Sequence, residues 1–167
     1  MESTDVLVIG SGIAGLCAAI EAARTGATVT VASAGKTMSG SSFFPGTWGL
    51  GLIGPVNEDD EQDLIDTILA VGGGVADPEL VQTFVHGIRQ AIDWLEQDLG
   101  VELQRPQSAK SAQQKQFIPC FDHKTRMWRG LTRKPLEDAL TTWIESLGIR
   151  LLPRMSLSTL LRTRTAE

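Results

Sequence analysis

The sequence lacks the features that mark several whole classes of protein. No apolar run approaches the ~20 residues of a membrane-spanning helix, and the acidic Asp5 lies where a secretory signal peptide carries basic residues. Only two cysteines occur, Cys17 and Cys120, and their separation fits neither a redox pair nor the ligand spacing of a metal site. We therefore expect a cytoplasmic protein with no transmembrane segment, no disulfide and no metal.

Positive charge is scarce over most of the chain. Residues 1–123 carry 6 basic and 16 acidic side chains, whereas residues 124–167 carry 9 basic and 4 acidic ones, which gives net charges of −10 and +5 within a total of −5. This distribution argues against a general nucleic-acid-binding surface, so we expect no nucleic-acid partner. The basic segment suits a small anionic ligand or an acidic partner, or it is simply solvated.

The first 32 residues predict a strand, a helix and a second strand. The continuous apolar run at 6–9 is typical of a parallel strand that is buried on both faces. Small and apolar residues at 13–25 favour a helix pressed against a sheet, and Gly26 suits its C-terminal end. The β-branched pattern at 28–32 then indicates the second strand.

A glycine motif separates the first strand from the helix. Gly10, Gly12 and Gly15 have the GxGxxG spacing, with Ile13 and Ala14 completing the first turn of the helix. The first glycine permits a tight turn, the second lets a pyrophosphate approach the backbone, and the third lets helix and strand pack closely. In this strand-to-helix context the motif predicts a dinucleotide site, with a plain glycine-rich turn as the alternative.

The second strand ends without the acidic residue that usually binds the adenosine ribose. In its place the sequence has Ser33, Ala34 and, shortly after, Lys36. A serine hydroxyl can hydrogen-bond a ribose hydroxyl, although it is a neutral and weaker partner than a carboxylate. This substitution counts more against an NAD site than against a flavin site.

The rest of the chain predicts further helices and strands, and 167 residues suit one domain. Residues 33–57 read as a long functional loop. Asn57 and the Asp77–Pro78 pair are start signals for two of the helices. The predicted helices are 59–72, 78–99 and 135–147. The predicted strands are 101–103, 149–152 and 157–161.

Two segments carry a resemblance to a known family. Residues 6–36, VLVIGSGIAGLCAAIEAARTGATVTVASAGK, and the loop Gly40-Ser41-Ser42-Phe43-Phe44 resemble the flavoproteins that include L-aspartate oxidase and the flavoprotein subunits of fumarate reductase and succinate dehydrogenase. The resemblance implies an α/β fold, a Rossmann-like three-layer FAD/NAD(P)-binding domain with a parallel sheet. It also implies that the strand at 157–161 receives the adenine.

The resemblance further implies where the flavin lies and how it is held. In the family, a loop like Gly40, Ser41 and Ser42 lies against the flavin, and later glycines, matched here by Gly49 and Gly51, lie near its ring system. Ser41 takes the position at which respiratory members carry a histidine bonded to the flavin. Since serine cannot form that link, we expect noncovalent FAD.

Family members are several times longer than this chain. The resemblance therefore implies that residues 1–167 are the N-terminal portion of an FAD-binding domain, without the capping domain and the C-terminal FAD-binding segment. A second polypeptide is a possible source of the cap. The implied parent reaction is hydride transfer between a small dicarboxylate or amino-dicarboxylate and flavin. The alternative is a stand-alone nucleotide-binding or interaction module without catalysis, so enzymatic activity of the chain itself stays open.

No convincing catalytic set emerges from the remaining polar residues. A cluster of Asp122, His123, Arg126 and Arg129 offers groups that can bind a carboxylate, or it is a structural polar loop. His86 falls on the polar side of its helix and reads as solvated. Cys17 falls on the helix face that meets the sheet, where it reads as a small core residue, and Trp48 either stacks on the flavin or fills a gap.

Overall fold

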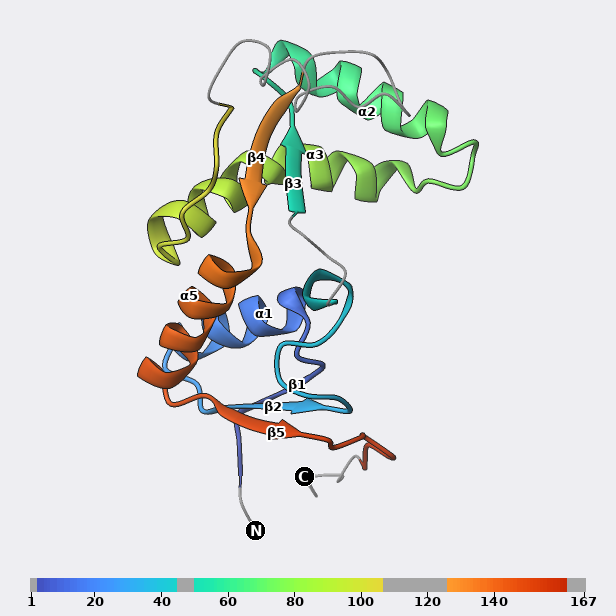
Figure 1. Ribbon diagram of the computed structural model, residues 1–167. Helices are drawn as coiled ribbons and strands as arrows, with labels where there is room; N and C mark the ends of the chain where they lie inside the picture. Colours follow the sequence, from blue (N-terminus) through green and yellow to red (C-terminus); the bar gives the residue numbers. More distant parts are fainter. Residues whose placement is uncertain (1–2, 45–49, 107–125, 162–167) are drawn as a thin grey trace. The chain divides into compact units, whose positions relative to one another are not determined.

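The computed structural model describes residues 3–44, 50–106 and 126–161. These residues divide into two units: 3–44 with 137–161, and 50–106 with 126–136. Figure 1 labels the helices and strands of both units. The first unit contains the glycine motif, and the second contains the helix with the strongest apolar periodicity.

A parallel sheet forms the base of the first unit. Its strands are β1 (Val6–Ile9), β2 (Val29–Ser33) and β5 (Arg150–Pro153), in the order β1-β2-β5. Val6 pairs with Val29, and Thr30 pairs with Arg150, both in parallel register. The predicted strands at 6–9, 28–32 and 149–152 and the parallel sheet are therefore confirmed.

Two helices cover one face of this sheet. Figure 1 shows α1 (Ile13–Arg24) and α5 (Arg133–Ser146) on the same side of the strands. The guanidinium of Arg24 lies 5.5 Å from the ring centre of Trp143, a cation–π contact that joins the two helices. The apolar residues that these helices bury within the unit are Leu16, Ala19, Ile20, Ala23, Leu140 and Ile144.

The other face of β1 is exposed, which corrects the expectation that 6–9 is buried on both faces. Leu7 and Ile9 are 44% and 52% exposed. Val8 points to the helix side, because a Cβ placed on Gly15 of α1 would lie 3.4 Å from Val8 Cγ1. Since side chains alternate along a strand, Leu7 and Ile9 point away from the helices. The described residues of this unit thus supply two of the three expected layers.

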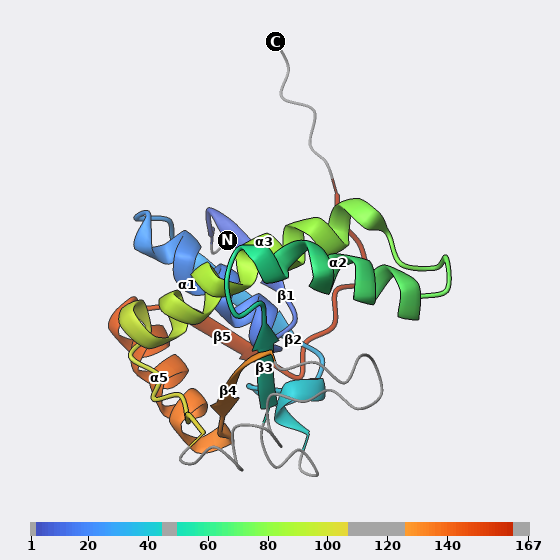
Figure 2. The same ribbon diagram turned by 90° about the horizontal axis from the view of Figure 1, so that it is seen from above.

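The second unit contains a helical hairpin that lies beside a pair of strands. Figures 1 and 2 show α2 (Asp59–Val71) and α3 (Pro78–Asp93) side by side. Asp77 is the N-cap of α3, as expected, and its Oδ1 accepts the backbone N–H of Glu79. The N-cap of α2 is Glu58 and not the expected Asn57, although Asn57 Oδ1 accepts the backbone N–H of Asp60. A π-helical turn, Trp94–Asp98, continues α3. The hairpin core consists of Leu64, Ile65, Val81 and Val85, with Ile68, Leu69 and Ala76 packed against it.

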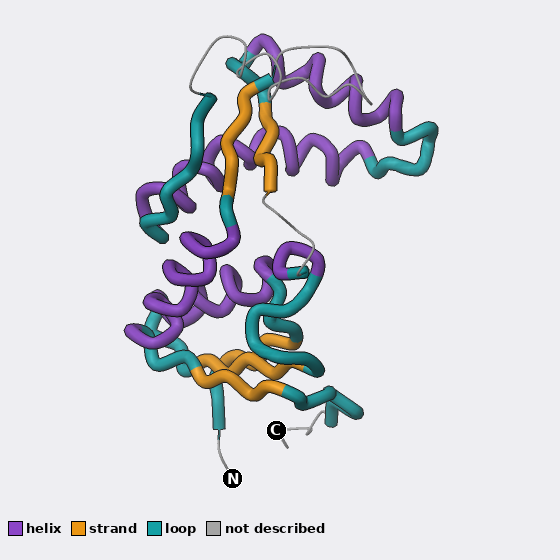
Figure 3. The backbone as a smooth tube through the Cα atoms, in the orientation of Figure 1, coloured by secondary structure: helices purple, strands orange, loops and turns teal. Residues whose placement is uncertain are grey.

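The strand pair of the second unit was not predicted. β3 (Leu50–Gly54) lies inside the segment read as a loop, and it pairs antiparallel with β4 (Met127–Leu131). The two strands lie side by side in Figure 3. Two predicted strands are wrong. Residues 101–103 form no strand, although Gln104 bridges Gly130, and residues 157–161 form none either. The likeness of 157–161 to an adenine-binding strand is therefore not supported.

Candidate functional site

The turn after β1 has a backbone conformation that requires glycine. Gly10 has a φ of +107°, which side-chain-bearing residues rarely adopt. Its N–H donates to the carbonyl oxygen of Ala32 on β2 at 2.7 Å. The turn is thus fixed to the neighbouring strand, and the predicted role of Gly10 in a tight turn has a clear structural basis.

Gly15 allows the helix to approach the turn closely. A Cβ at this position would lie 2.1 Å from the carbonyl oxygen of Gly10, a distance that no packed atom pair tolerates. The backbone of α1 at Gly15 therefore lies directly against the backbone of the turn at Gly10. This is the packing role expected of the third glycine.

The start of α1 is open to an anion. Its N-cap is Gly12, with φ −73° and ψ 173°, and no side chain caps the helix or places an acid in its first turn. The first N–H groups of a helix, here on Ile13, Ala14 and Gly15, have no intrahelical acceptor and carry the positive end of the helix dipole. This uncapped, glycine-lined terminus fits the pyrophosphate of a dinucleotide.

Ser33 lies at the end of β2, as predicted, but its hydroxyl is already engaged. The residue is 6% exposed, and Ser11 Oγ donates to Ser33 Oγ at 2.9 Å. Ala34 and Lys36 follow on the surface. Sequence reasoning missed Ser11, the residue between the first two glycines. The available signal was a serine inside the glycine motif together with a second serine at the end of β2, the neighbouring parallel strand.

The loop that follows β2 returns to the glycine turn. Gly40 has a φ of +111°, and a Cβ there would lie 3.6 Å from Gly12 Cα. A short 3-10 helix, η1 (Ser41–Phe43), comes next, with Ser41 exposed, Ser42 half-buried and Phe43 buried. The structure therefore places Gly40, the first residue of the predicted flavin loop, against the glycine turn at Gly12.

The other predicted flavin-side glycines lie elsewhere. Gly49 falls outside the described residues, as does Trp48. Gly51 belongs to β3 in the second unit, directly opposite Gly130. A Cβ on Gly51 would lie 2.9 Å from the indole Nε1 of Trp128, so this glycine makes room for an aromatic ring. Its role toward the flavin stays a prediction.

The structure gives Arg126 of the candidate carboxylate cluster a structural role. Arg126 is fully buried; its guanidinium pairs with Asp60, and its Nη2 donates to Asp63 Oδ2 at 2.7 Å. Arg129 Nη1 donates to the carbonyl oxygen of Trp128 at 2.9 Å. Asp122 and His123 fall outside the described residues. Because its charge is already balanced by two carboxylates of α2, Arg126 is not available to a substrate.

His86 is exposed, as expected, whereas Cys17 is half-buried and not part of the buried core. His86 has a side chain that is 58% exposed, with Nε2 3.7 Å from a carboxylate oxygen of Glu61. Burial, together with the nearby charge of Glu21, raises the pKa of Cys17 to about 11. The thiol is thus neutral at ordinary pH. Cys17 is one of the residues packed in the first unit and not a reactive nucleophile.

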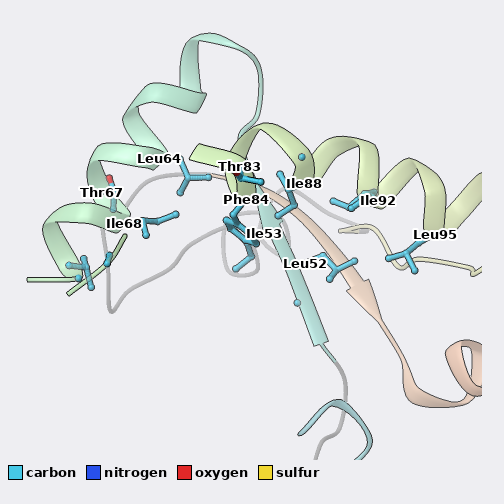
Figure 4. Close-up of a pocket in the computed structure, with 16 residues that line it drawn as sticks. Leu52, Ile53, Leu64, Thr67, Ile68, Thr83, Phe84, Ile88, Ile92 and Leu95 are labelled. Carbon is cyan, nitrogen blue, oxygen red and sulfur yellow. The ribbon is translucent and has the colours of Figure 1, made fainter. Parts of the chain in front are cut away.

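An apolar groove of about 800 Å³ occupies the second unit (Figure 4). Its polar side chains are Thr67 and Thr83, and no lining residue is titratable. A dicarboxylate needs cationic or hydrogen-bonding partners that this groove does not offer, so we assign it no catalytic role. The labelled apolar side chains around it are Leu52, Ile53, Leu64, Ile68, Phe84, Ile88, Ile92 and Leu95.

Two further expectations concern membranes and metals. Within residues 3–44, 50–106 and 126–161, no helix has the length and apolar content to cross a membrane. In the same ranges, no three His, Cys, Asp or Glu side chains gather as a potential metal site.

Known proteins resemble this chain in both sequence and fold. An L-aspartate oxidase of Halobacterium salinarum is 45% identical over 100 residues, which are 59% of this chain and 19% of that protein. A 3-ketosteroid-Δ4-(5α)-dehydrogenase from Rhodococcus jostii superposes with a TM-score of 0.71 at 23% identity, over 95% of this chain and 39% of that one. A flavocytochrome c3 fumarate reductase superposes with a TM-score of 0.64 at 22% identity, over 92% and 27%.

The chain thus spans only 19% of the length of the aspartate oxidase that it matches. The structural likenesses establish the fold, which is that of a Rossmann-like FAD-binding domain. A family described as the FAD binding domain matches residues 5–166. The cofactor is therefore FAD, and the start of α1 beside the glycine turn has no side-chain cap. By this match over almost its whole length, the chain belongs to the FAD-binding domain family of flavin-dependent oxidoreductases.

Proposed function

We propose that this chain is the FAD-binding portion of an oxidoreductase that transfers hydride between a small dicarboxylate or amino-dicarboxylate and flavin. The observation that carries the proposal is the 45% identity to an L-aspartate oxidase. The protein named there oxidises aspartate, an amino-dicarboxylate. The flavin, when bound, supplies the redox chemistry by exchanging a hydride with the substrate.

The residues of this chain would bind and orient the cofactor. We assign the pyrophosphate to Gly10, Gly12, Ile13, Ala14 and Gly15, supported by the uncapped start of α1. Ser33, Ala34 and Lys36 would border the adenosine ribose. Gly40, Ser41, Ser42, Gly49 and Gly51 would border the flavin.

The described residues do not supply a catalytic set for a dicarboxylate. Arg126 is buried against Asp60 and Asp63, and His86 is largely exposed. Substrate must be held in near-attack geometry, with groups that stabilise its carboxylates, before hydride transfer becomes fast. We therefore propose that a capping domain, supplied by further or separate polypeptide, completes the active site, in a protein located in the cytoplasm.

A second candidate function is a nucleotide-binding module that performs no catalysis. The observation that favours it is the same shortage of substrate-binding groups among the described residues. The two candidates agree on FAD binding and differ on turnover, so one preparation can test both.

The experiment begins with a fluorescence titration of the purified chain with FAD and, separately, with NAD. We expect saturable FAD binding and no comparable NAD binding. The FAD-loaded chain is then supplied with aspartate and oxygen, or with fumarate and a reduced dye, and product is followed. We expect no turnover until the capping polypeptide is added.

Tight NAD binding without FAD binding would refute the assignment of the cofactor site. Turnover by the chain alone would show that it contains a complete active site. Persistent inactivity after addition of a capping polypeptide would favour the module without catalysis.

A further inference from the structure

Three serine hydroxyls, two of them buried, meet in a triangle beside the glycine turn. Ser11 Oγ lies 2.9 Å from Ser33 Oγ and 3.2 Å from Ser39 Oγ, and Ser33 Oγ lies 3.3 Å from Ser39 Oγ. Ser11 is 1% exposed and Ser33 is 6% exposed. The three residues come from the turn, the end of β2 and the loop after β2, so the triangle connects three segments.

The loop backbone is tied to the same place. The carbonyl oxygen of Lys36 lies 3.2 Å from Ser11 Oγ, within hydrogen-bond distance, and the N–H of Ser39 donates to the carbonyl oxygen of Ser11 at 3.1 Å. A Cβ on Gly12 would lie 3.4 Å from the carbonyl oxygen of Ser39, which is close contact. Residues 36–40 are thus held directly on the turn that would receive the pyrophosphate.

The contacts within the triangle outnumber its protons. Three hydroxyls carry three protons. Three oxygen–oxygen contacts within the triangle and two contacts to the Lys36 carbonyl compete for them. A ribose that approaches Ser33 therefore competes with the other two serines and the Lys36 carbonyl for its hydroxyl.

The loop adopts its conformation at a cost. Met38 has a φ of +53°, in the left-handed region that side-chain-bearing residues avoid. This conformation persists only if interactions with the surrounding residues offset its cost. The triangle and the Ser39 backbone bond flank Met38 on both sides and provide this constraint.

We infer that Ser11, Ser33 and Ser39 form a latch that holds residues 36–40 against the glycine turn and so preorganises the adenosine side of the FAD site. In this position Ser33 is a positioning residue for the loop. The inference rests on the proposed FAD function for its effect on affinity, because a preformed loop spares the ligand the cost of ordering it. The latch itself is a property of the chain without cofactor.

Trypsin cleavage after Lys36 measures the latch directly, because the carbonyl that trypsin attacks is the one bonded to Ser11 Oγ. The full chain without FAD is digested briefly, and the peptide ending at Lys36 is quantified by mass spectrometry. In Ser11→Ala we expect cleavage about tenfold faster, since the hydroxyls of Ser33 and Ser39 lose a buried partner. The FAD dissociation constant should rise by a similar factor.

Two further variants sharpen the test. Ser3→Ala removes an exposed hydroxyl in the same unit and should leave both readouts unchanged. Ser39→Ala opens the latch from the loop side, and it decides the question if Ser11→Ala does not fold. If the three serines act as one latch, the Ser11→Ala/Ser39→Ala double variant should be cleaved little faster than either single variant.

Each outcome bears on one claim. Cleavage of Ser11→Ala and Ser39→Ala at the wild-type rate would overturn the latch. Faster cleavage with an unchanged FAD dissociation constant would overturn its role in preorganising the site. A wild-type chain that binds no FAD would refute the proposed function, while the cleavage rates would still decide whether the latch exists.

Discussion

Replacing Arg126 with methionine separates a structural role from a role in substrate binding. Arg126 is fully buried at the start of β4, and its guanidinium pairs with Asp60 and Asp63, one turn apart on α2. Methionine retains part of the buried apolar volume but removes the charge. The two carboxylates are then left near each other without their shared cation, so α2 should lose its attachment to β4.

The expected magnitude follows from burial. Removing one partner of a buried ion pair costs about 3–5 kcal/mol, because the other partner is left uncompensated. Here the side chains of Asp60 and Asp63 are 20% and 42% exposed, so water can partly hydrate them again. We therefore expect the lower end, a loss of about 3 kcal/mol in the free energy of unfolding.

Urea denaturation followed by circular dichroism measures this loss. Arg89→Met is the matched control, because Arg89 is an exposed arginine of the same unit that donates to the carbonyl oxygen of Val56 at 3.2 Å. It should cost less than about 1 kcal/mol. Adding Asp60→Asn and Asp63→Asn to Arg126→Met should recover stability. An Arg126→Met variant within about 0.5 kcal/mol of wild type would refute the structural role.

Three other predictions concern the cofactor, the turn and the thiol. Acid precipitation should release all the flavin, since Ser41 cannot form a histidyl link; flavin retained in the pellet would contradict this. Gly15→Ala should abolish FAD binding and destabilise the first unit, because its Cβ would lie 2.1 Å from Gly10 O, whereas Gly87→Ala, in open space on α3, should be neutral or stabilising. In a Cys120→Ser background, Cys17 should react slowly with thiol reagents at pH 8. Stability should fall between pH 9 and 11, because the folded thiol, with its pKa raised to about 11 from 9.0, keeps a proton that the unfolded chain releases; a flat pH profile there would count against it.

The first βαβ unit was predictable because its signals are local. The turn needs a residue that accepts a φ of +107° at Gly10, and the helix needs a residue without Cβ at Gly15. Both requirements fall within six residues of sequence, between a strand and a helix with clear patterns. Neither depends on a distant partner, so the spacing alone predicted the geometry of this strand-to-helix turn.

The strands of the second unit were missed for the opposite reason. β3 and β4 contain the facing glycines Gly51 and Gly130, a residue type that weakens the strand pattern. The indole of Trp128 fills the space beside both glycines, as the close approach of a Cβ at either position shows. A ring from one strand thus replaces the missing side chains of both, and that relation appears only when the strands are paired.

The role of Arg126 could not be predicted either, because its partners are distant in the sequence. In the sequence its neighbours are Asp122, His123 and Arg129, which suggested a carboxylate-binding cluster. Its partners in the structure, Asp60 and Asp63, lie 66 and 63 residues earlier in the chain. The basic segment suited a small anionic ligand, an acidic partner or plain solvation, and only the ion pairs of Arg126 with two carboxylates of α2 show which applies to this residue.

β1 was predicted to be buried on both faces, but one of its faces is exposed. The continuous apolar run from Val6 to Ile9 is typical of a strand covered on both faces. The described residues cover only the face of Val8, and Leu7 and Ile9 remain 44% and 52% exposed. A strand with one solvated face normally alternates apolar and polar residues. The sequence of β1 therefore carries the pattern of a sheet with a layer on each side, which agrees with the proposal that further polypeptide completes this FAD-binding domain.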